Sequence, residues 1–144
     1  MVLDASVGSG TRLGPGVNGT VSKRTPTYLG IDLGFIIARD TSVEWTMGAI
    51  VQIEDQPAAA LHPQVRLVKQ VKSTKVLALI GAPLFLVPTT MLGLDFGGGV
   101  VIPVNDAVGI FTVGTVGVFF EGEDIQKDSV VTAFNLGLGA RISF

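Results

Sequence analysis

The sequence predicts an all-β fold, a closed antiparallel up-and-down transmembrane β-barrel of about eight strands, formed by residues 1–144 as a single domain. Apolar residues make up 47% of the chain and charged residues only 15%, compared with about 25% charged residues in an average soluble domain. Bulky apolar side chains alternate with small or polar ones along several segments. The connections between these segments also alternate between short and long, as in membrane barrels.

The composition disfavours helices and several classes of function. There are 19 glycines and many β-branched residues, and both types are unfavourable inside helices. The longest apolar-rich stretch, Val76 to Val87, is interrupted by Gly81 and Pro83, so a membrane-spanning helix is not expected. The absence of cysteine excludes disulfides and thiolate sites. With a net charge of −2, the chain offers no basic stripe for nucleic acid, and we expect no nucleic-acid partner.

Four segments show the alternation of a half-buried strand most clearly, with bulky apolar residues on one parity. They are residues 28–38, 43–53, 92–104 and 134–144. Four further strands are expected where prolines, bulges or apolar residues on both faces obscure the pattern: residues 2–9, 64–72, 75–86 and 108–120. Together these segments give the predicted count of about eight strands.

The predicted connections fall into two classes. Tight turns are expected at Asp40–Ser42, Ser73–Thr74 and Asn105–Asp106, where side chains can hydrogen-bond their own backbone. Most of the others are longer and are expected at residues 10–26, 54–63 and 121–128, with a short one at 87–89. Barrels of the bacterial outer membrane have short periplasmic turns and longer outer loops. The pattern therefore predicts an outer-membrane location with both termini in the periplasm.

The bulky parity is expected to face lipid, because the interior of an eight-stranded barrel is only wide enough for side chains. Seven polar side chains then point inward: Asp4, Asp32, Glu44, Arg66, Asp95, Asn135 and Arg141. Buried ions are costly unless they are paired, so we expect a network in which Arg141 lies beside Asp4 and Glu44. This network either fills the barrel or lines a very narrow ion path.

The whole chain resembles the small eight-stranded outer-membrane barrels, the family that includes the transmembrane domain of outer membrane protein A. The resemblance is most specific at the carboxyl end, where apolar residues alternate up to a terminal phenylalanine: Phe134, Leu136, Leu138, Ile142 and Phe144. It implies that these residues form a signal for the outer-membrane assembly machinery and that membrane lipids are the other partner. The chain departs from the family in its few aromatic residues, which include only Trp45 and Tyr28 besides phenylalanine.

The sequence contains little that predicts catalysis. The lone His62 is expected on an outer loop, without a serine at His-x-Ser spacing, and a triad needs serine and carboxylate partners. Gly97, Gly98 and Gly99 lack the lysine and helix of a phosphate loop, so they are expected to relieve crowding or permit curvature. We expect a non-enzymatic barrel without cofactor or metal, acting as a scaffold, a surface-loop binder or a very narrow pore. A lipid-modifying enzyme and a soluble carrier of an apolar ligand remain the alternatives.

Overall fold

The computed structural model describes residues 1–16, 19–38, 42–54, 57–122 and 129–144. No helix within these ranges has the length and hydropathy needed to cross a membrane. The same ranges contain nine strands, which are β1 (Val2–Gly16), β2 (Gly19–Ala38), β3 (Val43–Gln52), β4 (Ala58–Val71), β5 (Thr74–Gly81), β6 (Leu84–Val87), β7 (Met91–Pro103), β8 (Val108–Gly122) and β9 (Val131–Ser143).

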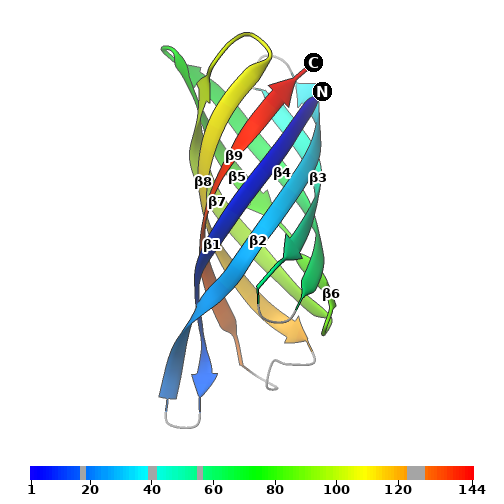
Figure 1. Cartoon of the computed structure of the whole chain (residues 1–144), viewed down its shortest axis with the longest axis vertical. Coiled ribbons are helices and arrows are strands. Elements are labelled where there is room, and N and C mark those ends of the chain that lie inside the picture. The colour runs from blue at the N-terminus through cyan, green and yellow to red at the C-terminus, as the bar shows by residue number, and fades with distance from the viewer. Residues whose placement is uncertain (17–18, 39–41, 55–56, 123–128) are drawn as a thin grey trace.

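The strands form one closed antiparallel sheet (Figure 1). Except for β5 and β6, strands that are neighbours in sequence pair with each other, and β9 pairs with β1, so the ring has no open end. Both β5 and β6 pair with β4 and β7, so these two short strands occupy one position in a ring of eight. Pro83 lies in the break between them and has no N–H for the ladder. The predicted eight-stranded up-and-down barrel is therefore confirmed.

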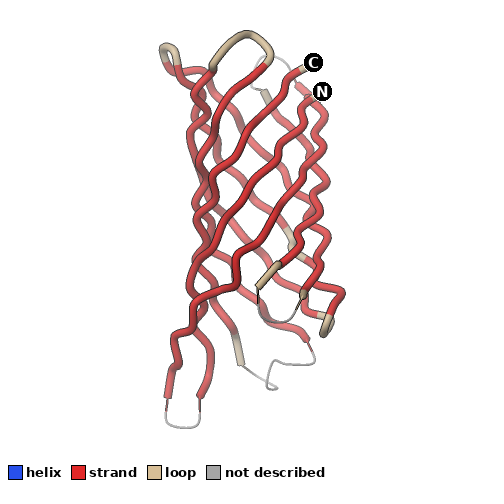
Figure 2. The backbone as a smooth tube through the Cα atoms, viewed as in Figure 1, coloured by secondary structure: helices blue, strands red, loops and turns tan. Residues whose placement is uncertain are grey.

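Both chain termini and the turns that join β4 to β5 and β7 to β8 lie at one end of the barrel, here called the terminal end (Figure 2). The Phe144 N–H donates to the carbonyl of Met1 over 2.9 Å. The side chain of Asn105 accepts hydrogen bonds from the backbone N–H groups of Ala107 and Val108, as expected for that turn. The second predicted turn lies one residue earlier, at Lys72–Ser73. Of the first, only Ser42 lies within the described residues.

The opposite end of the barrel is here called the hairpin end (Figure 1). The prediction of a loop at residues 10–26, which lie at this end, is wrong. In the structure β1 continues to Gly16 and β2 begins at Gly19, with Arg12 opposite Lys23. Glycine and proline in this segment suggested a loop, but the two arms satisfy their backbone hydrogen bonds by pairing with each other. Similarly, β4 begins at Ala58, inside the predicted loop 54–63. The predicted loop 121–128 overlaps β8 up to Gly122, and residues 123–128 lie outside the described ranges.

The outer surface is apolar, which confirms the predicted orientation of the strands. On β2, for example, Leu29, Ile31, Leu33, Phe35 and Ile37 are all exposed. The alternate residues Gly30, Asp32 and Gly34 lie on the inner face of the strand, close to side chains of neighbouring strands. The barrel therefore has no conventional apolar centre with a polar surface.

Candidate functional site

A network of ion pairs crosses the interior in the terminal half of the barrel. Arg141 on β9 donates from Nε and Nη2 to the two carboxylate oxygens of Asp4 on β1, over 2.8 and 2.9 Å. From Nη1 and Nη2 it also donates to the carboxylate oxygens of Glu44 on β3, over 3.2 and 3.0 Å. Asp4, Glu44 and Arg141 are each at most 3% exposed. Each of these charged side chains thus has a partner of opposite charge on another strand, as a buried ion requires.

A second arginine extends this network towards the hairpin end. Arg66 on β4 donates from Nη1 to Asp4 and from Nη2 to Asp32, the latter over 2.9 Å. Its Nε donates to Oε1 of Gln64 over 2.9 Å. Asp4 is therefore shared by both arginines. The five charged residues of this network are called the plug: Asp4, Asp32, Glu44, Arg66 and Arg141.

The other side of the terminal half is filled with apolar side chains. The buried cluster consists of Val68, Leu77, Leu79, Val101 and Phe111, from β4, β5, β7 and β8. The plug comes from β1 to β4 and β9, whereas this cluster comes from β4, β5, β7 and β8. A cavity of about 20 Å³ at the terminal end is lined by Arg141, and it shares no lining residue with the large cavity on the other side.

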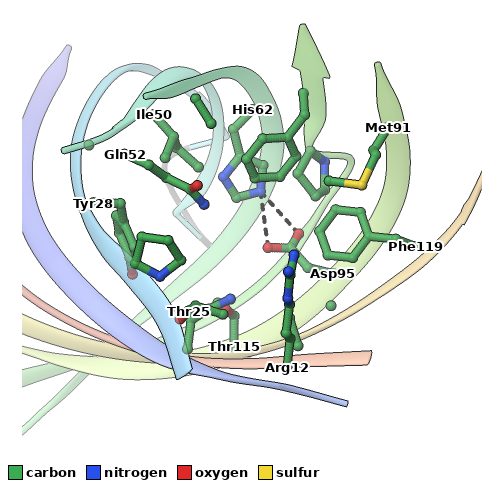
Figure 3. Close-up of a pocket in the computed structure, with 18 of the residues that line it drawn as sticks. Arg12, Thr25, Tyr28, Ile50, Gln52, His62, Met91, Asp95, Thr115 and Phe119 are labelled. Atoms are coloured by element: carbon green, nitrogen blue, oxygen red, sulfur yellow. Dashed lines mark hydrogen bonds and ion pairs between the residues drawn. The ribbon is translucent and has the colours of Figure 1, made fainter. Parts of the chain in front are cut away.

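The hairpin half contains a cavity of about 900 Å³ (Figure 3). Asp4, Asp32 and Arg66 of the plug are among the residues that line it. Its two sides differ in chemistry. The side formed by β1 to β4 is mostly polar and includes Arg12, Lys23 and Tyr28. The side formed by β5 to β8 is mostly apolar; its largest side chains are Leu77, Leu79, Phe85, Met91, Phe111 and Phe119. A cavity with one polar and one apolar side can bind a molecule that has both an apolar and a polar part.

His62 is not on a loop, as the sequence predicted, but on β4, where it points into the cavity beside Asp95 (Figure 3). Its Nε2 lies 3.1 and 3.0 Å from the two carboxylate oxygens of Asp95, and its Nδ1 lies 3.0 Å from Nε2 of Gln64. Because Oε1 of Gln64 accepts from Arg66, its amide nitrogen is the atom that faces His62. The neutral Nε2–H tautomer satisfies all these contacts. The prediction failed because β4 begins earlier than its prolines and polar residues suggested.

Glycines make room for the inward polar groups. A Cβ atom at Gly81 would collide with Oδ1 of Asp95 and lie 2.6 Å from Nε2 of His62, and one at Gly48 would collide with Asp32. Gly97 and Gly99 have another role, because a Cβ there would collide with backbone carbonyls of β8. The close approach of β7 and β8 therefore accounts for these two glycines, as the crowding interpretation expected.

The remaining predicted residues lie apart from the plug. Asn135 on β9 accepts a hydrogen bond from Thr25 over 3.4 Å at the cavity wall, and Asp95 pairs with His62 rather than with an arginine. The residues of the predicted assembly signal are all exposed on the outer face of the last strand or at the chain end: Phe134, Leu136, Leu138, Ile142 and Phe144. Among the described residues, no group of His, Asp or Glu side chains has the arrangement of a metal site.

The base of the β1–β2 hairpin is held by Glu54, just beyond β3. Its carboxylate accepts from the backbone N–H of Thr27 over 2.9 Å and from Nη2 of Arg24 over 3.0 Å. The hydrogen bond from the Thr27 backbone, with smaller contributions from its side chain and from Arg24, lowers the pKa of Glu54. Arg24 is thus paired at the mouth of the cavity. Arg12 and Lys23, in contrast, make no ion pair with any described residue.

Two solved structures share this fold. Neisserial surface protein A (NspA) aligns with a TM-score of 0.67 over 100% of this chain and 99% of its own, at 12% identity. The outer membrane enzyme PagL aligns with a TM-score of 0.56 over 98% and 99%, at 13% identity. No family model matches the chain, and no curated protein matches it significantly. The likeness establishes the fold of a small eight-stranded barrel, which is shared here by an outer membrane enzyme and by a surface protein.

Proposed function

We propose that this protein is a non-conducting barrel of the bacterial outer membrane, which acts as a scaffold and presents a binding cavity at its hairpin end. The observation that carries the proposal is the plug, because two arginines and three carboxylates close the interior that a pore would need open. Between the two outcomes considered from the sequence, a filled interior and a narrow ion path, the plug supports the first.

The apolar outer surface supports the location in a membrane. In water, a continuous apolar exterior of this size would be unfavourable, whereas in lipid it lowers the free energy and the closed ring leaves no unpaired strand edge. This argues against the soluble carrier considered from the sequence. We further propose that the termini face the periplasm and that the exposed carboxyl-terminal pattern ending in Phe144 is read by the assembly machinery.

The surroundings of His62 support a non-enzymatic role. A general base needs a free ring nitrogen within reach of a nucleophile, but both ring nitrogens of His62 face partners among the described residues, Asp95 and Gln64. His62 also lies inside the barrel and is 7% exposed, so a lipid in the surrounding membrane cannot reach it. These contacts favour the scaffold over a lipid-modifying enzyme.

Recording single-channel current across a planar bilayer tests whether the plug seals the barrel. We expect no discrete current steps from the wild-type protein. Replacing Asp4, Arg66 and Arg141 together with alanine should produce cation-selective steps, since Asp32 and Glu44 remain on the inner wall. A shift in gel mobility between unboiled and boiled samples confirms that the variant is folded. Stable steps from the wild type would overturn the proposal.

Cysteine labelling tests the orientation, because the natural chain contains no cysteine. We expect a membrane-impermeant maleimide added to intact cells to label Ser22→Cys on the β1–β2 hairpin but not Asp106→Cys in a terminal-end turn. Both positions are exposed, and both should react after the cells are lysed. Labelling of Asp106→Cys alone in intact cells would reverse the proposed topology.

A further inference from the structure

We propose that the cavity at the hairpin end binds an amphiphilic monoanion, a small molecule with an apolar body and one carboxylate or sulfonate group. This inference rests on the proposed function, because it needs a cavity that is closed below by the plug and open to the outside. It goes further by naming the chemistry of the ligand.

The charge of the ligand follows from which charged groups of the cavity lack a partner. Its carboxylates all have partners: Asp4 and Asp32 pair with Arg66, and Asp95 pairs with His62. Arg12 and Lys23 lie opposite each other on β1 and β2, both line the cavity, and neither makes an ion pair with a described residue. Figure 3 shows Arg12 pointing into the cavity. Two neighbouring cations without an ion-pair partner at a wall favour an anion over a neutral or cationic ligand at that wall.

The count of charges covers the described residues only. The acidic side chains of Glu121, Glu123, Asp124 and Asp128 lie outside the described part of the structure. The experiment below therefore tests the two cations directly rather than the balance of the whole hairpin end.

The apolar body of the ligand follows from the opposite wall. Phe85 and Phe119 meet edge to face with ring centroids 5.7 Å apart, and both line the cavity beside Met91. Aromatic rings and a methionine side chain adapt well to an aromatic or aliphatic group. The volume of about 900 Å³ lies within the range of pockets that bind small molecules, roughly 300–1,000 Å³. An anion without an apolar part would leave this wall in contact with water.

Three matched probes separate the contributions of charge and apolar contact. We would measure the binding of 2-naphthoate, neutral 2-naphthamide and cationic 2-naphthylmethylamine by calorimetry. The protein would be held in nanodiscs of zwitterionic lipid, with empty nanodiscs as the blank. We expect 2-naphthoate to bind most tightly and the cation least. Replacing both Arg12 and Lys23 with glutamine should weaken the binding of 2-naphthoate by about fivefold to tenfold, the range expected for two partly exposed charges.

The control variants make the result specific. The double substitution should leave the affinity for 2-naphthamide unchanged, and Lys72→Gln with Lys75→Gln at the terminal end should change neither affinity. Phe119→Ala should weaken the binding of both 2-naphthoate and 2-naphthamide. If unboiled and boiled samples of Phe119→Ala show no difference in gel mobility, the variant is not folded and Met91→Ala is measured instead. Equal binding of the three probes, or an unchanged affinity for 2-naphthoate after the double substitution, would overturn the inference. Because bilayer recording tests the plug separately, the proposed function would survive that failure.

Discussion

The two halves of the barrel are built from the same strands, but side chains fill the interior of one half and enclose a cavity in the other. In the terminal half, two arginines are surrounded by three carboxylates and an apolar cluster fills the remaining space. In the hairpin half, the walls enclose about 900 Å³, and Arg12 and Lys23 lie on the polar side without a described partner. The comparison teaches that paired charges lie in the filled half of this barrel, whereas the cations without a described partner line its open half.

The largest effect is expected from breaking the plug. Arg141→Ala leaves Asp4 and Glu44 buried with less compensation, and removing one partner of a buried ion pair costs about 3–5 kcal/mol. The urea midpoint of protein refolded in detergent should fall clearly. Adding Glu44→Ala should restore part of the loss, because every described ion pair of Glu44 is made with Arg141. An unchanged midpoint for Arg141→Ala would mean that the plug does not stabilise the terminal half.

A smaller effect is expected at the boundary of the two halves, where Gly81 supports the His62–Asp95 pair. The added methyl group of Gly81→Ala would push against both side chains, and such overpacking typically costs about 1–3 kcal/mol. Gly114→Ala is the matched control, because its Cβ would lie 3.9 Å from the nearest neighbouring atom. Thermal unfolding of both variants in detergent measures the difference. If both melt at the same temperature, the pair is not tightly packed.

The smallest effect is expected at the hairpin end, where Arg24 and Glu54 pair at the surface. Exposed ion pairs are screened by solvent and contribute little to stability, so Arg24→Gln should shift the urea midpoint far less than Arg141→Ala. An effect as large as that of Arg141→Ala would remove the energetic distinction between the two halves.

The pH dependence of Glu54 sharpens the same contrast. Because its pKa is lowered from the usual value of 4.5, the stabilisation by its carboxylate is fully present above pH 4.5 and is lost as the pH falls through the lowered pKa. The difference in urea midpoint between the wild type and Glu54→Gln should therefore be constant at neutral pH and shrink below about 4.5. A difference that stays constant into the acid range would show that the ionised carboxylate is not what holds the hairpin.

The parts of the fold that follow from local alternation could be predicted, and the parts that depend on partners across the barrel could not. The bulky parity of β2 and β9 identifies the outer face, because a strand exposes every second residue to one environment. The inward position of Arg141 beside Asp4 and Glu44 follows from the same parity together with closure of the ring. His62 was misplaced since the start of β4 depends on pairing with β3, which local composition does not encode. The cavity was not foreseen, because a volume is a property of all walls together.

The closure of the ring limits the order in which contacts can form during assembly. The first and last strands pair with each other, and Arg141 reaches Asp4 across 137 positions of the chain. Such a long-range contact cannot form until the last strand has been made and brought alongside the first. Until then the sheet has two open edges, which invite pairing with other chains, and Asp4 lacks one of its two arginines. The ion pair between Arg141 and Asp4 and the pairing of β9 with β1 therefore form together.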